Sequence, residues 1–213
     1  MTTTTLRGDD LHALNPLQLD ALREVANMGA AHAATALSLM TGGRIMIAVP
    51  RLHVAPLDAV APELAPAEQP VAAVVMDMLG DLTGRTLLVF PKPTVLRLAE
   101  TMLRRPVGSS VDLGELERSA VQEIGNILSG AYMNALSDFM GMVLLPSPPA
   151  LTVDCVAGVI SPAFLRLDAV SDPVFVVETE FYMHEAQERL RGFFLLLPDP
   201  ASLQAILRAV RLA

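Results

Sequence analysis

The chain has 213 residues, of which 52% are hydrophobic, 18% are charged and 4% are aromatic, and its formal net charge is −8. This acidic balance argues against a nucleic-acid-binding surface, which requires a basic face. No run of apolar residues reaches the length of a membrane span, and residues 1–10 lack the apolar segment of a signal peptide, so we expect neither. The single cysteine, Cys155, excludes an internal disulfide and suits a reducing compartment, so we expect a cytoplasmic protein.

The first predicted element is a helix that begins at Asn15 and Pro16 and ends before Gly42. An N-cap residue followed by proline favours the start, and glycine favours the end. Apolar residues recur along one side of this helix; they are Leu19, Leu22, Val25, Ala26, Gly29, Ala33, Leu37 and Met40. A short strand at 45–49 follows and ends at Pro50.

Four more elements complete the N-terminal half. Residues 55–70 are rich in proline and are predicted to form a loop. Strands are predicted at 71–78 and 86–90. Thr94 is expected to cap a helix that extends to about residue 103.

The same order of elements is then predicted again. Asp112 and Glu115 suggest a capping box for a helix that runs to Met140 and ends at Gly141. Strands at 142–145, 174–183 and 192–197 follow, and Ser202 is expected to cap a last helix. We therefore expect one domain, residues 1–213, made of two repeats of about 15–108 and 112–213 that pack with pseudo-twofold symmetry around a shared core.

Three polar residues occur at the same spacing on both long predicted helices. They are Asp20, Glu24 and Asn27 on the first helix, and Ser119, Glu123 and Asn126 on the second. The spacing i, i+4, i+7 confines each set to an arc of about 60° on an α-helix. Both arcs lie opposite the apolar residues of their helix, so we expect the polar side chains to face outward.

A single Glu-x-x-Asn on a helix is weak evidence for a functional site, because most such pairs belong to a solvated face. Two observations favour a function. The matched positions hold the same two residue types, and each Asn is followed at the same distance by a proline, Pro50 or Pro149. Small neighbours such as Gly29 and Gly125 are expected to leave room for another surface to approach.

These residues resemble the pattern Asp/Ser-x3-Glu-x2-Asn-x22-Pro of the CheC/CheX/FliY family of chemotaxis phosphatases, present here twice. The flanking residues at 22–30 and 122–130 are also similar to CheC, and the resemblance covers nearly the whole chain. Two copies favour the two-motif CheC subgroup over CheX, which keeps one active motif. The family implies an α+β fold, in which an antiparallel sheet carries the two long motif-bearing helices exposed on one side.

The resemblance implies a hydrolase that removes the aspartyl phosphate from a CheY-type response regulator in chemotaxis, a form of two-component signalling. Three kinds of role follow for the motif residues. Asn27 and Asn126 would orient the attacking water; Glu24 and Glu123 would pair with the receiver's active-site lysine. Asp20, Ser119, Pro50 and Pro149 would play supporting parts. We expect no cofactor in this chain, because the Mg²⁺ would be bound by the receiver.

No other residue pattern in the sequence indicates a site. The four histidines lack paired metal-ligand spacing, and no Gly-rich phosphate loop is present. Two alternatives remain open. The chain could be a non-catalytic binding module that sequesters a CheD-type receptor deamidase, or a structural part of the flagellar switch; the second is least favoured, because no FliN-like segment is visible.

Overall fold

The computed structural model describes residues 16–164, 173–184 and 187–212. Its helices are α1 (Pro16–Thr41), α2 (Leu57–Leu64), α3 (Lys92–Met102), α4 (Glu115–Met140), α5 (Val156–Phe164) and α6 (Pro200–Leu212). Its strands are β1 (Ile45–Ile47), β2 (Arg51–Pro56), β3 (Pro70–Gly80), β4 (Gly84–Pro91), β5 (Leu144–Pro146), β6 (Ala150–Cys155), β7 (Pro173–Met183) and β8 (Glu188–Pro198).

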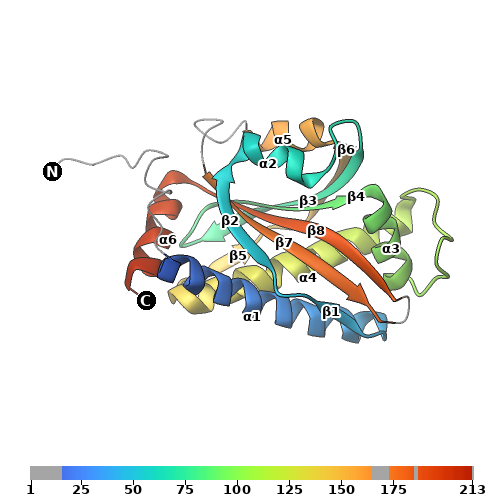
Figure 1. Cartoon of the computed structure of the whole chain (residues 1–213), viewed down its shortest axis with the longest axis horizontal. Coiled ribbons are helices and arrows are strands. Elements are labelled where there is room, and N and C mark those ends of the chain that lie inside the picture. The colour runs from blue at the N-terminus through green and yellow to red at the C-terminus, as the bar shows by residue number, and fades with distance from the viewer. Residues whose placement is uncertain (1–15, 165–172, 185–186, 213) are drawn as a thin grey trace.

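The strands form one antiparallel sheet in the order β1-β7-β8-β4-β3-β5, with β2 also on β7 and β6 also on β3. Helices α1 and α4 lie side by side on one face, α2 and α5 cover the other face, and α3 and α6 lie at opposite ends (Figure 1). The predicted α+β class, with an antiparallel sheet and two long helices on one side, is confirmed. The order helix-strand-strand-helix-strand-strand-helix occurs twice, whereas the repeat boundaries and the pseudo-twofold symmetry remain predictions.

Strands of each half pair with strands of the other half. In the N-terminal half, β1 and β2 pair with β7, so that Ile45 lies opposite Met183 and Leu52 opposite Val177. In the C-terminal half, β5 and β6 pair with β3 in the same way. The central ladder between β4 and β8 joins the halves directly. Each half therefore completes the sheet of the other, and the chain has a shared core.

The central strands are buried on both faces, which explains their nearly continuous apolar sequences. In β4, Leu88 and Phe90 face the core under α1 and α4, while Leu87 and Val89 face the core under α2 and α5. The same alternation places Phe194 in the first core and its neighbour Phe193 in the second. Two apolar layers therefore hold the sheet between its helices.

The proline-rich segment at 55–70 contains a helix, so the predicted loop is wrong. Leu57, Val60 and Leu64 recur at helical spacing and are all buried against the sheet. Burial of this apolar face outweighs the hydrogen bond that Pro62 removes within the helix. The sequence prediction also missed the short elements β2, β6 and α5; the two strands adjoin prolines and α5 contains one.

The three predicted caps within the described residues are also wrong. Helix α3 begins at Lys92, so Thr94 lies inside it, and Ser202 lies inside α6, where its Oγ accepts a hydrogen bond from the backbone N–H of Thr83 (2.8 Å). Helix α4 has Gly114 as its N-cap, and the Asp112 carboxylate accepts from the N–H of Leu113 instead (2.9 Å). Asn15 lies outside the described residues.

Two glycines of the motif helices are needed for packing. A Cβ atom on Gly29 would lie 2.6 Å from Cδ1 of Tyr132, and one on Gly125 would lie 2.5 Å from Cγ1 of Val74. Gly29 thus lets α1 approach α4, and Gly125 lets α4 approach the sheet. For these two glycines the expectation of room for another protein is wrong, because this chain's own side chains fill the space, whereas a Cβ on Gly130 would meet nothing within 4 Å.

Candidate functional site

Helices α1 and α4 carry the motif residues on the side away from the sheet. On α1, Asp20 and Glu24 are exposed and Asn27 is half-buried, while Leu22 and Val25 between them are buried in the core. Inner residues at this spacing fix the rotation of the helix, and that rotation turns the polar arc toward solvent.

On α4, Ser119, Glu123 and Asn126 are all exposed, and Val121 and Ile124 are buried between them. The predicted outward placement is therefore confirmed on both helices. The asparagines of the two sites differ in exposure, because Asn126 is more open than Asn27.

The motif glutamates and asparagines are without polar partners in the described ranges. Within the described part of the chain, the side chains of Glu24, Asn27, Glu123 and Asn126 make no hydrogen bond or ion pair. Asp20 differs, since its carboxylate pairs with Arg23 on the next turn at 2.7 Å. Four polar groups in two matched pairs are thus free to bind a partner molecule.

The two motif prolines lie where the sheet is interrupted. Pro50 is buried between β1 and β2, which pair with successive parts of β7. Pro149 lies between β5 and β6, and its carbonyl accepts a hydrogen bond from Nε2 of Gln122 on α4 (3.1 Å). A proline lacks the N–H that would continue the ladder, so these positions suit a break between strands.

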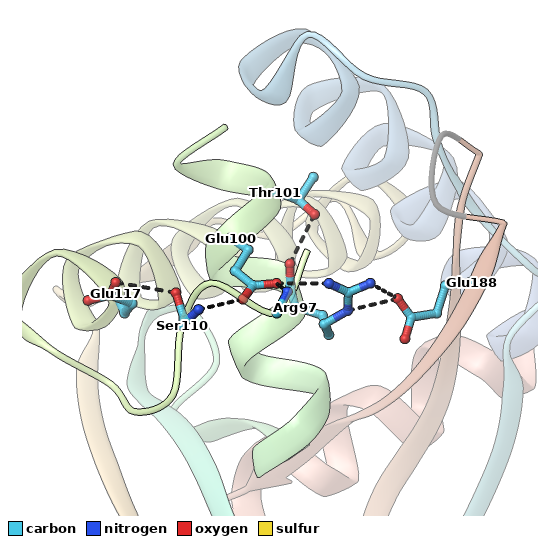
Figure 2. A network of polar contacts seen from close by, with 7 residues as sticks. Arg97, Glu100, Thr101, Ser110, Glu117 and Glu188 are labelled. Carbon is cyan, nitrogen blue, oxygen red and sulfur yellow. Dashed lines mark hydrogen bonds and ion pairs between the residues drawn. The ribbon is translucent and has the colours of Figure 1, made fainter. Parts of the chain in front are cut away.

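A second group of polar side chains lies between α3 and the start of α4 (Figure 2), with two buried carboxylates, Glu100 and Glu117, and partly exposed arginine partners. Glu100 on α3 is only 2% exposed. Its carboxylate accepts from the backbone N–H of Ser110 (2.7 Å), from that of Gly108 (3.0 Å) and from Nη1 of Arg97 (2.8 Å). Glu100 therefore holds the segment that joins the two halves.

Two ion pairs extend this group. Arg97 also binds the carboxylate of Glu188 on β8, with Nε at 2.9 Å and Nη2 at 2.5 Å. Glu117, in the first turn of α4, pairs with Arg105 and accepts from Oγ of Ser110 at 3.4 Å. The group therefore ties α3, the joining segment, α4 and β8 together.

The pKa values within this group follow from its contacts. Burial raises the pKa of Glu100, but the two backbone N–H groups and Arg97 outweigh it, and the net pKa lies below its ordinary value. The pKa of Arg97 is raised, chiefly by its hydrogen bonds to Glu188. Both side chains are therefore charged at neutral pH, and the group is a structural anchor whose hydrogen-bonding groups are satisfied.

The sequence prediction missed this anchor because Glu188 is far from Arg97 in the chain. The spacing of Arg97 and Glu100 at i, i+3 was the only local signal for it. Among the described residues, no cluster of His, Cys, Asp and Glu has the make-up of a metal site. Nor does any helix in those residues have the length and apolar content needed to cross a bilayer.

Both motif segments are similar to those of a known protein family. The family model described as "CheC-like family" matches residues 17–54 and 116–153, which are the two motif segments. The Bacillus subtilis protein named "CheY-P phosphatase CheC" is 33% identical over 195 residues, which cover 91% of this chain and 93% of that protein. The chain belongs to the CheC-like family. Its two matched segments confirm the predicted two-motif pattern.

Solved structures give the same fold for this CheC-like chain. Thermotoga maritima FliY aligns with a TM-score of 0.76 at 24% identity and covers 93% of this chain and 98% of that one. The FliM middle domain from H. pylori aligns with a TM-score of 0.64 at 14% identity and covers 92% and 99%. At these identities the likeness shows the fold alone.

Proposed function

We propose that this CheC-like protein hydrolyses the aspartyl phosphate of a phosphorylated CheY-type receiver domain. The observation that carries the proposal is the pair of outward-facing Glu-x-x-Asn sets on α1 and α4, whose side chains have no partners within the described residues. A relative that covers most of the chain is named a CheY-P phosphatase, which supports the same activity.

Hydrolysis of an acyl phosphate depends mainly on the position of the attacking water. Its transition state is loose, so hydrolysis needs a water held in line with the leaving carboxylate more than it needs a strong base. A carboxamide can both donate to and accept from one water, and it stays neutral beside the phosphoryl oxygens. Asn27 and Asn126 would each enter a receiver's active site and orient that water.

The glutamates would anchor the docked receiver. Glu24 and Glu123 lie one turn before the asparagines, on the same side of their helices, and would pair with the receiver's active-site lysine. Asp20 and Ser119 would support docking from one turn further back. Pro50 and Pro149 would shape the chain behind each helix, and the receiver would bring its own Mg²⁺.

The test is the loss of phosphate from a purified CheY-type receiver, phosphorylated with acetyl phosphate in the presence of Mg²⁺. Wild-type protein should accelerate the loss well above the receiver's spontaneous rate. A module that only binds the receiver or sequesters a CheD-type deamidase would leave that rate unchanged. No acceleration at saturating protein would refute the proposed phosphatase activity.

A further inference from the structure

The motif helices share more residues than the family pattern requires. When Glu24 is aligned with Glu123, the same residue occupies several further positions of α1 and α4. These pairs are Leu17/Leu116, Ala21/Ala120, Ala36/Ala135, Leu37/Leu136 and Ser38/Ser137. There should therefore be a reason why both helices have each shared residue, either a structural role in the fold or a role at the surface.

Most of the shared residues have a structural reason. Leu37 and Leu136 are buried in the core, and the alanines are buried or half-buried. The hydroxyl of Ser38 bonds both backbone groups of Ile45 (3.0 Å each), and that of Ser137 donates to the carbonyl of Met142. These serines fix the chain as it leaves each helix.

The leucine pair has no such reason. The Leu17 side chain is 74% exposed and that of Leu116 is 58% exposed, so neither contributes much to the core. An isolated exposed leucine is ordinary on a protein surface. Here, however, both halves expose a leucine at the same position, and the other outward residues that they share are the motif glutamates and asparagines.

The position of each leucine relative to the motif is also fixed. Leu17 precedes Glu24 by seven residues and Leu116 precedes Glu123 by seven. On an α-helix this spacing puts the two side chains about 20° apart around the axis and about 10 Å apart along it. Each leucine therefore extends the polar arc of its own helix at the N-terminal end.

We propose that Leu17 and Leu116 are docking residues, which make the apolar contact with the receiver domain that the motif asparagine enters. The inference rests on the proposed function. Each leucine lies about 15 Å along the helix from its asparagine. A compact domain of about 100 residues has a radius of gyration of about 13 Å, so one receiver can span both contacts. Burial of an apolar side chain would add affinity that the charged pair alone does not supply.

The experiment measures KM and kcat for phosphate loss from the acetyl-phosphate-treated receiver. The variant is Leu17→Ala/Leu116→Ala, and its control is Leu39→Ala. Leu39 is a leucine of α1 that is 79% exposed, but the matched position of α4 holds Asp138, so the two helices do not share it. We expect KM to rise about tenfold with kcat unchanged in the double variant, and no change in the control. Unchanged thermal unfolding of each variant checks that the fold is intact.

The outcomes separate this inference from the proposed function. An unchanged KM in the double variant, while wild-type protein is active, overturns the docking role and leaves the phosphatase proposal standing. An equal rise in KM for Leu39→Ala also overturns it, because the effect would then not be specific to the shared position. Wild-type protein without activity overturns both.

Discussion

Two glutamates of α4 show how the helix serves two purposes. Glu117 is buried at the start of the helix and paired with Arg105, in the anchor that also holds Glu100 and Arg97. Glu123, less than two turns further on, is exposed and makes no hydrogen bond or ion pair within the described residues. Buried carboxylates here are matched by hydrogen bonds and opposite charge, as the cost of burial requires. Carboxylates without partners gather on the outward side, where they are free to meet another protein.

The anchor should carry the largest effect on stability. Glu100→Ala would leave the N–H groups of Gly108 and Ser110 without their acceptor and remove one partner of Arg97. We expect the free energy of unfolding to fall by about 3 kcal/mol. Chemical denaturation measures it. A change below about 0.5 kcal/mol would contradict the structural role of the anchor.

The pH dependence of stability should change in a related variant, Glu100→Gln. The folded pKa of Glu100 lies below its unfolded value, so its contribution is complete above the unfolded pKa and is lost as the pH falls through the folded pKa. The stability gap between wild-type and variant protein should therefore narrow on acidification. Denaturation curves at pH 7 and at steps down to about pH 3 would show it. A constant gap would mean that the charge of Glu100 is not what stabilises the anchor.

Substitution of a glycine should destabilise the protein more on the inner side of α4 than on its outer side. Gly125→Ala would place a methyl group against Val74 and should lower the free energy of unfolding by about 1–3 kcal/mol. The control is Gly130→Ala, because a Cβ there meets nothing within 4 Å. Removing a mid-helix glycine should raise stability by about 0.5–1 kcal/mol. Thermal unfolding of both variants compares them, and equal shifts would be inconsistent with the packing described.

The smallest effect on stability should come from the outward glutamates. Glu24→Gln/Glu123→Gln should change the free energy of unfolding by less than about 0.5 kcal/mol, because neither side chain has a partner among the residues that the structure describes. The KM for the phosphorylated receiver should nevertheless rise about tenfold, through loss of charge toward the receiver's lysine. Denaturation and kinetics on the same samples test both points. A marked loss of stability would show that these carboxylates serve the fold.

The sequence predicted the outward arcs well because a helical period is local information. The buried series at Leu22, Val25 and Ala26 fixes the rotation of α1, and the position of Glu24 follows from it. The apolar series ends sooner than predicted, since Met40 is 42% exposed. The strand at 71–78 was also found, because a strand buried on both faces is almost continuously apolar. The strand at 174–183 begins with four apolar residues and then alternates around Glu178 and Glu180, which is the pattern of a strand with one wetter face.

What the sequence could not predict depends on tertiary contacts. The helix at Leu57–Leu64 forms despite Pro62 because three apolar side chains fit the sheet. Ser202 is a residue type that often caps helices, but its hydroxyl accepts a hydrogen bond from the backbone N–H of Thr83 instead. The anchor needs Glu188, which reaches Arg97 only after the sheet has formed. Partners distant in sequence leave no periodic pattern.

The most direct measurement compares wild-type protein with Asn27→Ala/Asn126→Ala at saturating phosphorylated receiver. Because the asparagines are proposed to seat the water, we expect the maximal rate of phosphate loss to fall about 100-fold toward the spontaneous rate. Affinity for the receiver should change little, since the contacts of Glu24 and Glu123 remain. An acceleration retained in full by the double variant would contradict the account.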